Sequence, residues 1–78
     1  MSKGSFRSRD LNFAAYCMAE GQRLVAIEDD PRGNHSWFVL EDEERCKQLE
    51  DRYYNRKALV DPLQMAISIK EIKTRLYR

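Results

Sequence analysis

The sequence predicts a small α+β domain of order α-β-β-α-α, in which a β-hairpin packs on three helices. Two short apolar runs, at 24–27 and 37–40, flank a segment of turn-forming residues, a pattern typical of a hairpin. Apolar residues recur at helical spacing on either side of these runs. A chain of 78 residues buries only about 60% of its unfolded surface, which leaves material for one core. We therefore expect a single domain over residues 1–78, with residues 1–7 as a flexible N-terminal arm.

The first predicted helix begins after residue 10. Ser8 or Asp10 can cap it, because both side chains accept hydrogen bonds from free backbone N–H groups. Its apolar residues lie at the i, i+3, i+4, i+7 spacing of one buried face: Leu11, Ala14, Ala15 and Met18. Gly21 should end it, because glycine adopts the left-handed conformation past a helix end without strain.

The two predicted strands cover residues 22–28 and 36–40. Residues 29–35 between them contain nearly every turn-forming residue type, so the strands should pair as an antiparallel hairpin. A hairpin alone is marginally stable in water. We therefore expect it to lie on the helices.

Four acids, Glu41 to Glu44, precede a second predicted helix that should extend to about Arg56. Acids at this point cap a helix and complement its positive N-terminal dipole. They also form a charged patch, so the role of this acidic segment stays open. The residues spaced to face inward are Cys46, Leu49 and Tyr53.

The last third of the chain predicts a helix from Pro62 to Arg78. Asp61 can cap it, and proline suits the first helical position. An apolar stripe runs along it through Met65, Ile69, Ile72 and Leu76. This helix should therefore dock on the core and be required for folding.

Strand 36–40 is apolar on both faces, because alternate side chains of a strand point in opposite directions. Its candidate interface residues are Trp37, Phe38, Val39 and Leu40. A monomer of this length would leave one face uncovered. We therefore expect a homodimer or a bound partner.

The sequence carries no residue pattern of an enzyme. His35 is the only histidine and lies in the predicted turn, while Cys17 and Cys46 fall at inward helical positions, as reduced core thiols do. Neither cysteine belongs to a metal-binding cluster, and the acids flanking the hairpin lie on diverging element ends. We expect no catalytic residues, no metal and no cofactor.

Charge is unevenly distributed, although the formal net charge is only +1. Residues 28–44 hold seven acids and one arginine, whereas residues 52–78 hold seven basic residues and two acids. A candidate nucleic-acid-binding strip on the last helix comprises Lys70, Lys73 and Arg75, with Arg7 and Arg9 in support. Lys73 also lies near the apolar stripe, where its methylene groups can cover the core.

Several short motifs are spread over the chain from Ser8 to Tyr77. They are Ser8-x-Asp10-Leu11-x-x-Ala14-Ala15-Tyr16, Gly21-x-x-Leu24, Phe38-x-Leu40, Tyr53 or Tyr54, Val60-Asp61-Pro62 and Lys73-x-x-Leu76-Tyr77. Together they resemble a family of small uncharacterised bacterial, phage and mobile-element proteins catalogued as a domain of unknown function. Leu40 stands where that family leads us to expect a second phenylalanine. The resemblance implies a phage or mobile-element context and supplies no catalytic residues.

Two functions remain open for this binding module. The first is nucleic-acid binding by an accessory or regulatory protein. The second is protein interaction, as a homo-oligomeric adaptor or an inhibitor of a host protein, through the hairpin's outer face and the acids at 41–44. The chain shows no signal peptide and no run of about 20 apolar residues. We therefore expect a cytoplasmic protein that does not enter a membrane.

Overall fold

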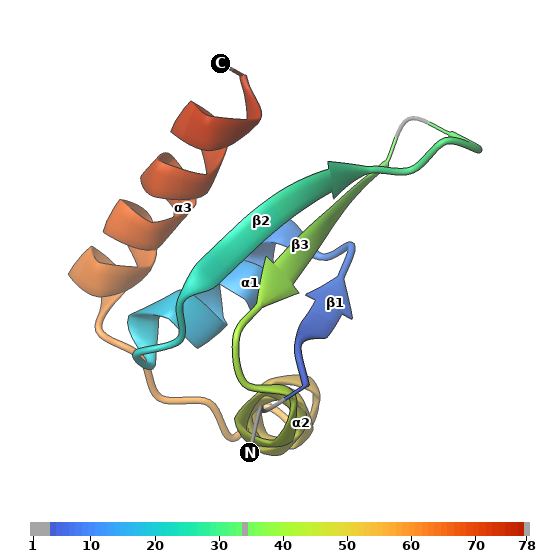
Figure 1. Cartoon of the computed structure of the whole chain (residues 1–78). Coiled ribbons are helices and arrows are strands. Elements are labelled where there is room, and N and C mark those ends of the chain that lie inside the picture. Colours follow the sequence, from blue (N-terminus) through green and yellow to red (C-terminus); the bar gives the residue numbers. More distant parts are fainter. Residues whose placement is uncertain (1–3, 34, 78) are drawn as a thin grey trace.

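Three helices and a three-stranded antiparallel sheet make up the computed structural model, which describes residues 4–33 and 35–77 (Figure 1). The elements are β1 (Phe6–Ser8), α1 (Leu11–Ala19), β2 (Leu24–Asp29), β3 (Ser36–Leu40), α2 (Glu43–Tyr54) and α3 (Pro62–Leu76). The sheet order is β1-β3-β2. The predicted hairpin is present as the antiparallel pair β2 and β3, and β1 lies on the other side of β3. The α+β fold class is confirmed.

The additional strand, β1, corrects the predicted element order. Phe6 and Arg7, which we expected in the flexible arm, lie in this strand, and Phe6 pairs with Leu40 at the far end of β3. Three residues are too short for a strand pattern to show in the sequence. The strand depends on the neighbouring β3, which supplies its backbone partners.

Helix α1 lies at the centre of the molecule, with α3 packed against it. Asp10 is its N-cap and accepts a hydrogen bond from the Phe13 N–H at 3.1 Å. Five consecutive residues of α1 are buried: Phe13, Ala14, Ala15, Tyr16 and Cys17. Such a run covers more than one helix face, because α1 contacts the sheet and both other helices.

Aromatic rings join β1, α1 and α2. The Phe13 ring contacts Phe6 at a centroid distance of 5.9 Å, Tyr53 at 5.4 Å and Tyr54 at 5.7 Å. Edge-on and offset arrangements of this kind add to the stabilisation from buried area. The chain entering α1 and the last turn of α2 are held together by this cluster.

The inward positions predicted for the helices are confirmed, because Cys46, Leu49 and Ile72 are fully buried. In the sheet, Leu24 is buried, and so are Phe38 and Leu40, which we expected at an interface. Met65, Ile69 and Leu76 are partly buried along α3. Asp61 caps α3 through a hydrogen bond from the Leu63 N–H, with Pro62 as its first residue.

Candidate interaction surfaces

The outer face of the sheet is covered by side chains of the same chain. The Arg7 guanidinium crosses from β1 to Glu28 on β2 and forms an ion pair at 2.6 Å. Arg7 and Arg9 each lie 5.3 Å from the centre of the Trp37 ring, within the range of cation–π attraction. The two candidate nucleic-acid-binding arginines are thus arranged around one tryptophan.

This covering changes the interpretation of strand 36–40. Val39, which we expected to need a partner, is only 7% exposed within a single chain. Phe38 and Leu40 lie in the core, so only Trp37 among the four candidate interface residues offers accessible surface. The reason for expecting a dimer through this face therefore fails, because Arg7 and its neighbours provide the cover.

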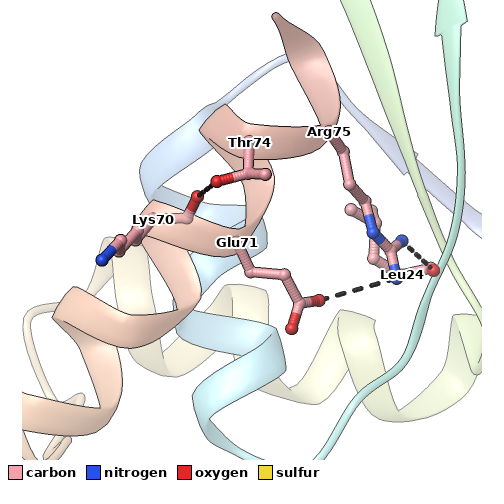
Figure 2. A network of polar contacts seen from close by, with 5 residues as sticks. All are labelled: Leu24, Lys70, Glu71, Thr74 and Arg75. Atoms are coloured by element: carbon pink, nitrogen blue, oxygen red, sulfur yellow. Dashed lines mark hydrogen bonds and ion pairs between the residues drawn. The ribbon is translucent and has the colours of Figure 1, made fainter. Parts of the chain in front are cut away.

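Arg75 also differs from its predicted role. Its Nη1 donates a hydrogen bond to the Leu24 carbonyl at 2.8 Å, and its Nη2 lies 3.6 Å from Glu71 Oε2 (Figure 2). Lys73 precedes Arg75 by two residues, so the two side chains leave α3 about 200° apart. The predicted strip is therefore divided: Arg75 connects α3 to β2, while Lys70 points away from β2 in Figure 2.

Lys70 and Lys73 line a shallow depression on α3 together with Ala66, Ile69 and Thr74. Among residues 4–33 and 35–77, neither lysine forms an ion pair. The Thr74 hydroxyl donates to the Lys70 carbonyl at 2.8 Å, so it does not hold the lysine side chain. Both ammonium groups are available to an anionic partner.

The same outward part of α3 exposes large apolar side chains. Leu63 is 65% exposed and Ile67 is 51% exposed, four residues apart and therefore on one helix face. Ala66 lies beside them and Leu59, just before the helix, is 90% exposed. We call Leu63, Ala66, Ile67, Lys70 and Lys73 the α3 outer face. The sequence contained this signal, because Leu63 and Ile67 lie opposite the apolar stripe on a helical wheel.

The acidic segment begins α2. Asp42 is the N-cap and accepts a hydrogen bond from the Arg45 N–H at 3.1 Å. Glu43 and Glu44 lie in the first turn, where negative charge offsets the helix dipole, and Glu43 also contacts Lys47 at 3.4 Å. The capping interpretation accounts for these residues.

The histidine and the two cysteines occupy different parts of the molecule. His35 is exposed beside the hairpin turn, and both cysteines are free and buried. Within the part of the chain that the structure describes, no three histidine, cysteine, aspartate or glutamate residues are placed to hold a metal ion. No helix in that part is long and apolar enough to cross a membrane.

Comparison with known proteins gives no relative for this chain: no family model, curated protein or solved structure matches it.

Proposed function

We propose that this protein is a non-enzymatic interaction module that binds another protein through the α3 outer face. The observation that carries this proposal is the exposure of two large apolar side chains on one face of α3. Leu63 and Ile67 are each more than half exposed. Exposed apolar residues that cluster on one face are typical of interaction sites. Helical partners are commonly recognised through apolar positions four residues apart.

The flanking charge indicates the kind of partner. Lys70 and Lys73 border the apolar positions and face solvent. Charge around an apolar contact steers association and selects partners of opposite sign. The partner should therefore present an apolar surface bordered by carboxylates.

The biological setting of the proposal comes from sequence resemblance alone. The motifs between Ser8 and Tyr77 support a role as an accessory or regulatory protein of a phage or mobile element, acting in the cytoplasm. A partner from the host or from the same element would fit this setting.

Photo-crosslinking tests the proposal in the cell that expresses the protein. A photoreactive amino acid placed at Leu63 or Ile67 should give a defined adduct with another protein. The same residue at Arg32, exposed in the hairpin turn, is the matched control and should give none. Leu63→Gln with Ile67→Gln should abolish co-purification of the crosslinked protein. Absence of adducts at both α3 positions, or equal adducts at all three, would contradict the proposal.

Nucleic-acid binding is a second candidate function, favoured by the accessible ammonium groups of Lys70 and Lys73. Binding through them would be electrostatic, with a log–log salt slope of about 0.9 per neutralised phosphate on duplex DNA. Lys70→Gln with Lys73→Gln should then remove a gel shift seen at low salt. Arg75 is excluded from this test because its hydrogen bond to Leu24 is structural. No shift of duplex or single-stranded DNA at low salt would eliminate this function.

A further inference from the structure

The outer face of the sheet carries two arginines around one tryptophan, and only one of the arginines has an acidic partner. Arg7 and Arg9 each lie 5.3 Å from the centre of the Trp37 ring, and Arg7 is paired with Glu28. Within residues 4–33 and 35–77, no acid lies within ion-pair distance of Arg9. We call Arg7, Arg9 and Trp37 the Trp37 cluster. With two guanidinium groups and one carboxylate, its surroundings attract an anion.

The Trp37 cluster lies on the side of the sheet that turns away from the core. Phe6 packs against the core, so Arg7, the next residue of β1, points to the other side. Phe38 and Trp37 alternate in the same way along β3. In Figure 1, α1 lies behind the sheet, on the core side. Arg7 and Arg9 are exposed and Trp37 is partly exposed, so a ligand in solution can reach all three.

Both arginines are held in place by the surrounding structure. The Arg7 guanidinium reaches from β1 to Glu28 on β2, at 2.6 Å. Arg9 connects β1 to α1 and lies between two residues that are joined by a hydrogen bond, from the Asp10 N–H to Ser8 Oγ at 3.1 Å. Asp10 is also the N-cap of α1. The Trp37 cluster is therefore formed before a ligand binds, which lowers the entropy cost of binding.

The chemistry of the Trp37 cluster matches a nucleotide unit. Indole rings and guanidinium planes both stack on nucleobases, so a base can add to the existing stack without displacing an arginine. The phosphate attached to that base is an anion, to which a guanidinium donates charge-assisted hydrogen bonds. The base must be unpaired, because neighbouring bases cover its faces inside a duplex. A carboxylate side chain of a protein partner offers the charge but no ring to stack.

We propose that the Trp37 cluster binds single-stranded nucleic acid, with one base stacked on the layer of indole and guanidinium groups and the adjacent phosphate held by Arg9. Arg7 stays paired with Glu28 and contributes its guanidinium plane to the stack. No α3 residue takes part, so this site is separate from both functions proposed for that helix.

Fluorescence of Trp37 tests the proposal, because it is the only tryptophan of the chain and its emission reports on this site alone. Titration of the full chain at low salt with an oligothymidylate of about ten nucleotides should quench the emission, since a stacked base contacts the ring. A duplex of equal length should not quench it. An abasic strand carries the same phosphates without bases, so it should bind about tenfold more weakly and leave the emission unchanged.

Variants separate this site from α3, with binding measured by the anisotropy of a labelled oligothymidylate. Arg9→Gln should weaken binding by about tenfold, because the phosphate loses a charged hydrogen-bond donor. Its log–log salt slope should fall by about 0.7, the value for one phosphate of a single strand. Arg52→Gln removes the same charge from an exposed arginine of α2 and should change neither value. Lys70→Gln with Lys73→Gln should keep the quenching of Trp37.

Circular dichroism should show that Arg9→Gln stays folded, because Arg9 is exposed. Three results would overturn the proposal, and two of them need only the wild type. One is unchanged Trp37 emission at low salt with saturating oligothymidylate. Another is equal binding of the abasic strand, which would reduce the contact to charge alone. The third is binding that is lost in Lys70→Gln with Lys73→Gln but kept in Arg9→Gln, which would place the nucleic acid on α3.

Discussion

Tyr54 at the end of α2 donates a hydrogen bond from its hydroxyl to Asp10 Oδ2, at 3.0 Å, while the other carboxylate oxygen of Asp10 caps α1. One aspartate thus connects the start of the central helix to the end of a helix 44 residues later. The Tyr54 ring also stacks on Phe13 at 5.7 Å. A local capping residue therefore also sets the position of α2 relative to α1.

Tyr54→Phe should lower the free energy of unfolding by about 0.5–1 kcal/mol, because it removes this hydrogen bond and keeps the ring contact. Tyr54→Ala should cost more, since the contact with Phe13 is then lost as well. Chemical denaturation of the two variants beside the wild type measures both values. Equal costs for Phe and Ala would show that the ring contributes nothing.

The same pair predicts a pH dependence. Partial burial and the hydrogen bond to Asp10 raise the pKa of Tyr54 from 10.0 to about 12. Between these values the unfolded chain loses the phenolic proton while the folded chain keeps it, so stability falls as pH rises through this window. Burial also raises the pKa of Tyr16 and of Tyr53, so they add to the loss.

Absorbance of tyrosinate during a base titration measures this directly. The step near pH 12 should be absent from Tyr54→Phe, and that variant should lose less stability over the same pH range. A titration in which all tyrosines ionise near pH 10 without unfolding would contradict the assignment.

Substitution of Gly21 tests how much backbone strain a side chain would introduce at the end of α1. Its φ is +99°, the left-handed region, and a Cβ built there meets nothing within 4 Å. Gly21→Ala should therefore cost about 1–2 kcal/mol through backbone strain alone. Gly33→Ala is the matched control, because its Cβ would make only an ordinary contact with His35 at 3.6 Å. A denaturation experiment showing the two costs to be equal would remove the strain argument.

The sequence predicted those elements whose signals are local. Asp61 with Pro62 marked the start of α3, and Gly21 marked the end of α1. Period-two alternation separated Trp37 and Val39 from Phe38 and Leu40 but did not show which pair is buried. These signals depend on nearby residues and on backbone sterics, so they can be read without knowledge of tertiary contacts.

The sequence did not predict which of the candidate binding residues remain free in the folded protein. Whether Arg7, Arg9 or Arg75 is available depends on acids, rings and carbonyls brought near by folding: Glu28, Trp37 and Leu24. Helical spacing places a cation on a face but does not show what that face meets. The two faces of β3 posed the same problem, because β1 supplies an arginine that covers one of them.

Helix α3 contains one buried and one exposed isoleucine, so the cost of removing the same side chain can be compared in the core and at the surface. Ile72 is fully buried, whereas Ile67, five residues earlier, is 51% exposed. Ile72→Ala should cost about 2–5 kcal/mol, the usual range for removing a buried isoleucine side chain. Ile67→Ala should cost much less, since its side chain leaves little cavity. Thermal and denaturant unfolding measure both, and a large cost at Ile67 would mean that the α3 outer face is covered in solution.

The two thiols report on the opening of the core. Cys17 and Cys46 are both fully buried, and the hydrogen bond to Cys46 together with burial raises the pKa of Cys17 above its ordinary value. A buried thiol reacts slowly, because the thiolate is the nucleophile and the reagent must reach it. Native protein should therefore resist an aromatic disulfide reagent, and both thiols should react at once in denaturant.

The labelling rate should also follow stability. When core opening is fast relative to labelling, the rate reports the population of open molecules. Ile72→Ala should then be labelled faster than the wild type, by the factor that corresponds to its loss of stability, while Ile67→Ala should differ little from the wild type. Rapid reaction of one thiol in the native wild type would contradict this prediction, because it would require a path to Cys17 or Cys46 that bypasses unfolding.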